Sequence, residues 1–520
     1  MDSLTRSSEK FQALLDSVLF KTYTHSFSIE DKVQLSIAKA RSIAATSRIT
    51  LDDITHLSPR FWDLHREPIV CRDGATTTLL TIQYNLTCNI ETTATTLPNS
   101  GGFLLHTPHI GAAKYMPPTV PCGIPCTAIV MARLIDQAGV DNGIKPFLVS
   151  INDGKVMFPG ISARLLPPRG GANPVLHSIT LFNARDAPGD PTSSPDSDKR
   201  LGYLMSIWRA AIGSLCLSAT MIPGLAKSAF MVVMYGRRRR VGTAPSVPII
   251  TFKPQYAPIL TAFAQSFTFY HAATKIFRDH RVDFRVRHGV AACFKAVALR
   301  HMQDANLALS ERCGAQGLCN YNEISELHAN MRGIAIAEGD ILGLSIRLAT
   351  ELILNRYLLR LDSEERTHSP LWLHAEGLIS ACRSELHDFE NHRSAEFNRY
   401  ILPHCQPIVE TLGMALAYEA AVDAGLDESI TKLYLATAMR HDEAWYIEHM
   451  QLGQKALFDA EEDALACALP KLDKWMEMPG VGEYVSAPIV STERWLSFVS
   501  QLEVFSPSRL VDHSSRLSHL

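Results

Sequence analysis

The stretch ERCGAQGLCNYNEISELHANMRGIAIAEGD, from Glu311 to Asp340, decides how the rest of the chain is interpreted. A Cys-Gly-x-x-Gly turn holds Gly314 and Gly317, and a Glu-Gly pair follows one helix later at Glu338. A glycine turn lets backbone N–H groups approach a phosphate closely, and a carboxylate beside a glycine can reach a bound molecule unobstructed. The stretch therefore predicts a phosphate-binding turn and a reactive carboxylate. An ordinary helix end followed by a surface Glu-Gly is the simpler alternative.

A β-rich block precedes this stretch and begins with ETTATT at Glu91–Thr96. Short runs of β-branched or aromatic residues follow, separated by turn-forming residues. The runs are Phe103–Leu105, Ile129–Val130, Phe147–Val149 and Ile179–Phe182. Short apolar runs between such turns are typical of an antiparallel barrel or sandwich.

In their order along the chain, these two regions resemble the acyl-CoA oxidase and acyl-CoA dehydrogenase family. The resemblance rests on the ETTATT strand, the strand IKPFLVSI before a Pro-Gly turn, and the Glu-Gly pair. It implies an α+β fold with a helical N-terminal part, a middle antiparallel β-domain, a C-terminal helical bundle and the additional helical domain of the oxidases. It also implies FAD as cofactor, an acyl-CoA as substrate and a homodimer as the assembly.

The resemblance assigns Glu338 as the base that removes the α-proton of an acyl-CoA thioester. Such a base needs an apolar pocket, where desolvation raises a carboxylate pKa toward the working pH. The preceding residues 334–337 are apolar. Gly314 and Gly317 match part of the family's flavin-binding glycine turn, but Ala315 replaces its middle glycine. A methyl group fits there if φ is negative.

The resemblance also assigns three cationic residues to the flavin. In the run Arg237–Arg240, the family has an arginine that reaches the pyrophosphate of a neighbouring subunit's flavin, and Arg239 aligns best, with Arg240 next. Guanidinium suits phosphate through paired hydrogen bonds, although a solvated face or a nuclear signal is the alternative for such a run. Lys114 begins KYMPP where oxidases have Lys-Trp-Trp-Pro-Gly, so Pro118 replaces a glycine that approaches the flavin.

Composition divides the chain into segments of different character. The N-terminal part is predicted to be helical, with caps at Ser28 or Asp31 and near Thr50. The polar, proline-rich Asp186–Lys199 is predicted to be a loop. The predicted segments are 1–90 (helical), 91–185 (β-domain), 200–365 (bundle with the glutamate and flavin motifs), 370–505 (additional helical domain) and 506–520 (tail).

The overall composition excludes several classes of protein. With 520 residues and 46% apolar content the chain can form large cores, and its net charge of −3 favours neither nucleic acid nor an anionic membrane as partner. The eleven cysteines have no zinc-like spacing, so reduced thiols and no metal site are expected. The apolar run Ala210–Met234 could span a membrane, but Pro223 and Lys227 inside it favour a buried helix pair.

One departure from the family lies near Asn89. There TIQYNLTCN continues directly into IETTATT, and the helix-rich segment and flavin-contacting threonine loop that family members have at this point are absent. Either the gene model lacks an exon or this paralogue has lost part of its cofactor pocket. The second possibility supports a rival interpretation, a non-redox or inactive acyl-CoA-binding paralogue.

The last three residues, Ser518-His519-Leu520, resemble the Ser-Lys-Leu signal that the peroxisomal import receptor reads. They end a polar tail that a compact fold leaves accessible, and the family commonly works in peroxisomes. We therefore expect a peroxisomal enzyme that forms a trans-2-enoyl-CoA from a fatty or polyketide-derived acyl-CoA, in a fungal-type secondary-metabolite pathway. A chance tripeptide is the alternative.

Overall fold

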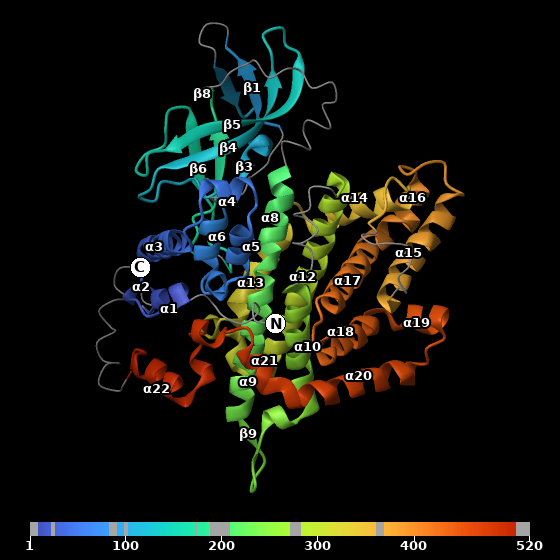
Figure 1. The fold of residues 1–520 in the computed structure, drawn as a ribbon. Coiled ribbons are helices and arrows are strands. Elements are labelled where there is room, and N and C mark those ends of the chain that lie inside the picture. Colours follow the sequence, from blue (N-terminus) through green and yellow to red (C-terminus); the bar gives the residue numbers. More distant parts are fainter. Residues whose placement is uncertain are drawn as a thin grey trace.

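A computed structural model describes residues 9–21, 27–82, 91–97, 102–171, 174–187, 208–270, 282–359 and 369–505. The chain forms a group of N-terminal helices, a β-domain at one end, and a long helical body that reaches the opposite end (Figure 1). The sequence around Asn89, most of the predicted 186–199 loop and the C-terminal tripeptide lie outside the described residues.

The N-terminal part is helical, as predicted, and its caps explain where two helices begin. Ser28 caps the third helix by accepting a hydrogen bond from the Asp31 N–H. Thr50 and Asp53 form a reciprocal capping box at the fourth. Both predicted caps are confirmed. The helices are α1 (Glu9–Leu15), α2 (Val18–Lys21), α3 (Ile29–Ser47), α4 (Leu51–Thr55), α5 (Pro59–Arg66) and α6 (Gly74–Ile82).

The β-domain contains two sheets, of five strands in the order β5-β4-β1-β2-β8 and of three in the order β3-β7-β6. Its strands are β1 (Thr93–Thr96), β2 (Phe103–His106), β3 (Lys114–Tyr115), β4 (Cys126–Ile135), β5 (Asp141–Asn152), β6 (Ile161–Leu165), β7 (Ser178–Phe182) and β8 (Arg185–Ala187). Phe103 and Phe147 meet edge to face in its core, with ring centroids 5.0 Å apart.

Two expectations for this domain need correction. Strand β1 pairs with β4 in parallel, so the larger sheet is mixed rather than wholly antiparallel. The predicted loop begins too early, because Asp186 belongs to β8 and pairs with Leu104 of β2. Backbone pairing with a strand distant in sequence outweighs the low strand propensity of aspartate here.

The helical body has a bundle followed by a C-terminal set of helices. The bundle elements are α8 (Trp208–Ala219), α9 (Met221–Arg238), β9 (Arg240–Val241), β10 (Val247–Pro248), α10 (Lys253–Tyr270), α12 (Phe284–Arg312), α13 (Ile324–Ile336) and α14 (Ile341–Ile353). The C-terminal helices are α15 (Pro370–Leu386), α16 (Ala395–Tyr400), α17 (Cys405–Asp423), α18 (Glu428–Met439), α19 (Glu443–Met450), α20 (Gln454–Ala468), α21 (Leu472–Glu477) and α22 (Thr492–Ser500).

Helices α8 and α9 account for the apolar run. Together they form the one stretch in the described residues long and apolar enough to cross a membrane, but 94% of its most apolar window is buried inside the protein. The prediction of a buried helix pair is thus confirmed. Gly224 permits this packing, because a Cβ at that position would lie 2.9 Å from the Met302 methyl group of α12.

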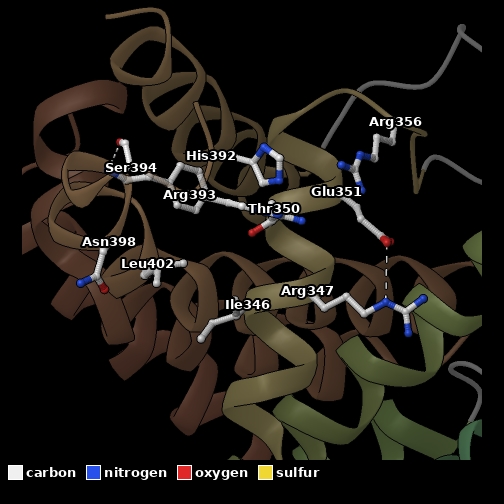
Figure 2. A pocket seen from close by; sticks show the side chains of 11 residues that line it. Ile346, Arg347, Thr350, Glu351, Arg356, His392, Arg393, Ser394, Asn398 and Leu402 are labelled. Carbon is white, nitrogen blue, oxygen red and sulfur yellow. Dashed lines mark hydrogen bonds and ion pairs between the residues drawn. The ribbon is translucent and has the colours of Figure 1, made fainter. Parts of the chain in front are cut away.

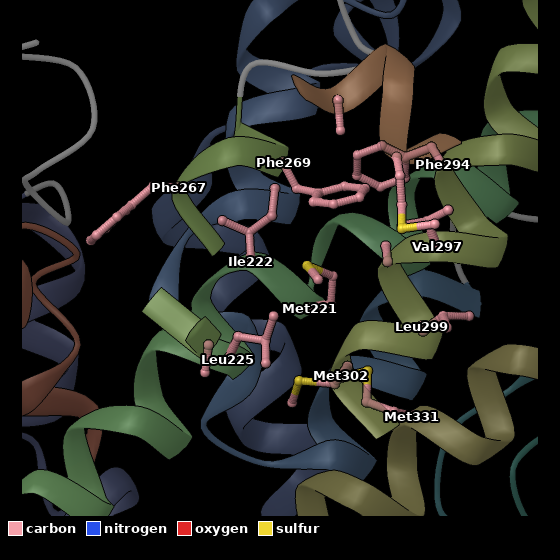
Figure 3. Packing of buried hydrophobic residues seen from close by; sticks show 14 of the residues in the cluster. Met221, Ile222, Leu225, Phe267, Phe269, Phe294, Val297, Leu299, Met302 and Met331 are labelled. Carbon is pink, nitrogen blue, oxygen red and sulfur yellow. The ribbon is translucent and has the colours of Figure 1, made fainter. Parts of the chain in front are cut away.

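One apolar core joins the N-terminal helices, the bundle and the C-terminal helices. Figure 3 shows part of it, where α9, α10 and α12 meet around Met221, Phe269 and Met302. Phe269 and Phe294 contact edge to face with centroids 5.4 Å apart. Because this core is continuous and closely packed, the side chains that line it are held in fixed positions.

A buried ion cluster crosses the same core. The Glu323 carboxylate lies 2.7 Å from the Lys227 ammonium of α9 and 3.3 Å from the Arg72 guanidinium of the N-terminal part. It also accepts a hydrogen bond from the Ser486 N–H, 2.8 Å away, in the C-terminal segment. The N-terminal part, α9 and the C-terminal segment therefore all bind the side chain of Glu323, which directly precedes α13.

Candidate active site

Glu338 lies in the short turn between α13 and α14. Its backbone is left-handed, with φ of +57°, and Gly339 follows with φ of +102°. A non-glycine residue in this conformation is strained and persists only where its surroundings hold it. The turn ends at Asp340, whose carboxylate caps α14 by accepting a hydrogen bond from the Gly343 N–H at 3.0 Å.

Two side chains from other helices hold the three successive carbonyl groups of this turn. The buried ammonium of Lys295, in the middle of α12, donates to the carbonyl oxygens of Ala337 and Gly339. The Ser214 hydroxyl of α8 donates to the carbonyl oxygen of Glu338 at 2.8 Å. These contacts fix the backbone on both sides of the carboxylate.

The surroundings of Glu338 perturb its protonation. Burial raises the pKa of its carboxyl to about 8, while the charges of Lys295 and Arg209 oppose that rise. Burial also lowers the pKa of Lys295 to about 8, against the opposing effect of Glu338 and Asp340. A carboxyl whose pKa lies near neutrality is suited to accept a proton from a weak carbon acid.

The apolar surroundings do not come from the preceding residues alone. Ile334 is buried, but Ile336 is 66% exposed and points away from the core. Helix α8 also bears on Glu338, because Arg209 and the buried Cys216 thiol both interact with it electrostatically. Arg209 is itself held by a hydrogen bond of 3.1 Å to the Ile54 carbonyl oxygen.

The glycine turn lies at the end of α12, as the short helix η4 (Gly314–Leu318). Gly314 has φ of +57° and no atom within 4 Å of a Cβ built on it, so its backbone faces open space. Ala315 is not among the residues with positive φ, so its methyl group is compatible with the turn. Gly317 is required for packing, since its Cβ would lie 1.9 Å from the Ser310 carbonyl oxygen.

The arginine run continues from the end of α9 into a short hairpin. Arg237 pairs with Asp473, and Arg240 donates to the Ser246 hydroxyl at 3.0 Å. Arg239 is exposed, and within the described chain its guanidinium has no partner. Of the two arginines assigned to a flavin, Arg239 is therefore the one that is free to bind a ligand.

Arg239 and the glycine turn lie near one another, far from Glu338. The Ile249 N–H donates to the Arg239 carbonyl oxygen at 2.8 Å, and nearby Arg312 donates to the Pro254 carbonyl oxygen at 2.7 Å. Arg312 is 17 positions beyond Lys295 on the same helix, a rise of roughly 25 Å. The hairpin and the β-domain are at opposite ends of the molecule (Figure 1).

Lys114 lies in the β-domain, on β3. Its ammonium is buried and donates to the Met131 carbonyl oxygen at 3.0 Å. It also lines a small cavity of about 60 Å³ between the two sheets, together with Tyr115 and Pro117. The residue that replaces the family's glycine, Pro118, is partly buried beside this cavity.

The larger cavity, of about 380 Å³, contains none of the predicted site residues. Figure 2 shows it between α14 and α16, lined among others by Arg347, Arg356 and Arg393. Arg347 pairs with Glu351 at 3.5 Å. No cluster of histidine, cysteine or carboxylate side chains in the described residues could hold a metal ion.

Sequence reasoning singled out Glu338 as a candidate base but missed Ser214 and Lys295, which hold its turn, and Arg209, whose charge acts on it. Lys295 did leave a signal. It is the one charged residue in the run VAACFKAVAL, whose other side chains form a buried face. A buried lysine inside an apolar helix face generally requires a partner for its ammonium. The partner, a turn 42 positions later, is not visible in the sequence pattern.

Comparisons with known proteins bear on the fold and the family. No family model matches the chain. Peroxisomal acyl-coenzyme A oxidase 3 of Homo sapiens is 23% identical over 286 residues, covering 48% of this chain and 41% of that protein. Acyl-coenzyme A oxidase 2, peroxisomal, of Arabidopsis thaliana is 25% identical over 306 residues, covering 52% of this chain and 43% of that protein. The matched region thus spans less than half of each relative.

Solved structures extend the likeness to nearly the whole chain. The crystal structure of acyl-CoA oxidase 1 from Yarrowia lipolytica has a TM-score of 0.77 at 14% identity and covers 98% of this chain and 92% of that one. Acyl-CoA oxidase-1 of Caenorhabditis elegans, complexed with FAD and ATP, has a TM-score of 0.77 at 13% identity, with 98% and 93% covered. The chain has the α+β fold of the acyl-CoA oxidases, and about half of its sequence is similar to the two named oxidases.

Proposed function

We propose that this chain is a flavin-dependent acyl-CoA oxidase or dehydrogenase that introduces a 2,3-double bond into a fatty or polyketide-derived acyl-CoA. One observation carries the proposal. Glu338 stands in a strained turn, its carboxyl is desolvated, and two helices distant in sequence hold its backbone. Backbone strain and a desolvated carboxyl are typical of residues that take part in chemistry, and not of residues in ordinary surface loops.

The residues present fit FAD as the cofactor. Arg239 offers a pyrophosphate a guanidinium that no described residue engages, and Gly314 presents open backbone in a left-handed turn nearby. We assign Arg239 and Gly314 to phosphate binding, Arg240 to support through the hairpin, and Gly317 to the shape of the turn. When bound, FAD would supply the redox chemistry by accepting a hydride from the β-carbon.

The protein's own part is to take and hold a proton. The ionised Glu338 carboxylate accepts the α-proton of the thioester, and the turn between α13 and α14 holds its backbone in the left-handed conformation. By family analogy the Glu338 N–H also donates to the thioester carbonyl oxygen. This hydrogen bond would stabilise negative charge on that oxygen and so lower the pKa of the α-proton. Lys114 keeps its proposed place beside the flavin, because its ammonium has three N–H donors and the Met131 carbonyl oxygen accepts from one of them.

The proposed active unit is a homodimer. Arg239 follows α9, and Ser214, which touches the Glu338 turn, is 25 positions earlier in the almost continuous α8–α9 helix. At 1.5 Å per residue the two are roughly 37 Å apart. One chain therefore cannot readily bring Arg239 to a cofactor beside its own Glu338, whereas a second copy can supply it.

The proposed location is the peroxisome, with the import receptor as a partner. Two of the sequence relatives are named peroxisomal, and the tripeptide Ser518–Leu520 resembles the import signal. A role in fungal-type secondary metabolism is the finer proposal and rests on the sequence resemblance alone.

A second candidate function, a non-redox or inactive acyl-CoA-binding paralogue, is favoured by the sequence gap near Asn89 and by Pro118. Ala315 no longer supports it, since its φ permits a side chain.

The deciding experiment is purification of the full chain with added FAD. The proposal predicts a yellow protein that retains flavin on gel filtration and converts an acyl-CoA to the enoyl-CoA. A folded but colourless protein that still binds acyl-CoA would establish the rival function. Sequencing the transcript across Asn89 would show which gap explanation holds.

A further inference from the structure

Lys295 is buried in a position that ordinary packing does not explain. Its side chain has no exposed surface, yet it forms no direct ion pair with a carboxylate in the described part of the chain. A buried ammonium costs several kcal/mol unless polar groups compensate it. The groups it meets are the carbonyl oxygens of Ala337 and Gly339, one on each side of Glu338.

We propose that Lys295 is the positioning residue of the Glu338 site, and that its buried charge keeps the carboxyl of Glu338 ionisable. The inference rests on the proposed function, since it assigns a purpose to the ionised state of that carboxyl. Lys295 does so in two ways. It clamps the backbone on both sides of Glu338, and it supplies the nearby positive charge that opposes desolvation.

The clamp explains how the strained turn persists. Glu338 and Gly339 both have positive φ, a combination that local sequence preference does not maintain for a glutamate. The Lys295 ammonium fixes the carbonyl groups before and after this pair, and Ser214 fixes the one between them. The direction of the carboxylate is thereby determined by α12 and α8.

The charge effect must be separated from those of the other groups that face the carboxyl. Arg209 and the Cys216 thiol interact with it from α8 and Lys295 from α12, while Asp340, just before α14, acts on Lys295. Arg209 is partly exposed and already bonded to Ile54, whereas Lys295 is fully buried. A charge acts more strongly in the low-dielectric interior than near solvent, so Lys295 affects the Glu338 carboxyl more than Arg209 does.

Two variants of Lys295 and one of Ser214 separate clamp from charge. Lys295→Gln keeps an amide donor and removes the charge, and Lys295→Arg keeps the charge. Ser214→Ala removes only a neutral donor from the same turn. The readout is the protonated carboxyl infrared band of Glu338 as a function of pH, assigned by its loss in Glu338→Gln. This titration needs neither flavin nor turnover.

The wild-type band should disappear with a midpoint near pH 8. In Lys295→Gln the midpoint should rise by about one pH unit or more, because an opposing charge within a few ångströms shifts a carboxyl by that amount. Lys295→Arg should restore the wild-type midpoint, and Ser214→Ala should leave it unmoved. If Lys295→Gln does not fold, an unchanged midpoint in Lys295→Arg alone still supports the charge role.

The inference is overturned if Lys295→Gln folds and titrates like the wild type, or if Ser214→Ala shifts the midpoint as far as Lys295→Gln. A protein that shows these midpoints yet binds no flavin would refute the proposed function while leaving the role of Lys295 intact. The two failures are therefore distinguishable.

Discussion

The two ends of the helical bundle differ in how completely they are built. At the Glu338 end, three successive carbonyl groups are engaged and a carboxyl is desolvated beside a buried lysine. At the other end, Arg239 is exposed and unpartnered in the described chain, and Gly314 faces open space. The groups of the first end are engaged within one chain, whereas the Arg239 guanidinium and the open side of Gly314 at the second end are not engaged by any described residue. We infer that chemistry is prepared by one subunit and cofactor phosphates are held by another.

The largest effect is expected from a substitution that alters only the Glu338 end. Glu338→Gln keeps the shape of the turn but removes the proton acceptor, so dehydrogenation should fall by roughly 10²–10⁴-fold, the usual loss for a general base. Flavin content and melting temperature should stay near wild type. Anaerobic flavin reduction by acyl-CoA in a stopped-flow instrument measures this, with the exposed Glu390→Gln as control. Near-normal reduction would refute the assignment.

The next effect concerns the Glu323 ion cluster, which joins the N-terminal part, α9 and the C-terminal segment between the two ends. Glu323→Gln leaves the Lys227 ammonium, whose side chain is 2% exposed, without its carboxylate. The free energy of unfolding should therefore fall by about 3–5 kcal/mol in urea titrations. The surface pair Lys455–Asp459 offers a matched control, because Asp459→Asn should cost under about 1 kcal/mol. Equal effects of the two substitutions would contradict a structural role for the cluster.

A third prediction sharpens the comparison within the glycine turn. Gly317→Ala places a methyl group against the backbone of Ser310 and should destabilise the protein by about 2 kcal/mol or more. Gly314→Ala meets no neighbour and should cost only about 1 kcal/mol, for its left-handed backbone. Thermal melts compare the two variants. If Gly314→Ala were the more damaging one, the turn would not be open as described.

The smallest effect is on pH dependence. If Glu338 is the base, it must be ionised to act; since burial raises its pKa to about 8, kcat/KM should rise about tenfold between pH 7 and a plateau above pH 8. The free energy of unfolding should instead decrease as pH rises. Between its ordinary value of 4.5 and about 8, native Glu338 keeps a proton that the unfolded chain has released, so stability falls as pH rises. Glu338→Gln should abolish this slope, and a wild-type slope in that variant would contradict the pKa assignment.

Sequence analysis predicted what local pattern determines. The caps at Ser28 and Thr50, the buried helix pair and the Glu-Gly turn all depend on neighbours in the chain. It could not predict the parallel pairing of β1 with β4, because strand alternation looks the same in both orientations. Nor could it predict that Ser214 and Lys295 converge on Glu338, since that contact depends on how α8 and α12 pack.

The central claim is that Glu338 of one chain and Arg239 of another complete one site. The direct test is a hybrid dimer of differently tagged chains, one carrying Glu338→Gln and the other Arg239→Gln. Each variant homodimer should be impaired, but the hybrid contains one site with both residues intact and should recover about half of the wild-type activity per dimer. A purified hybrid dimer that is no more active than its two parents would contradict the account.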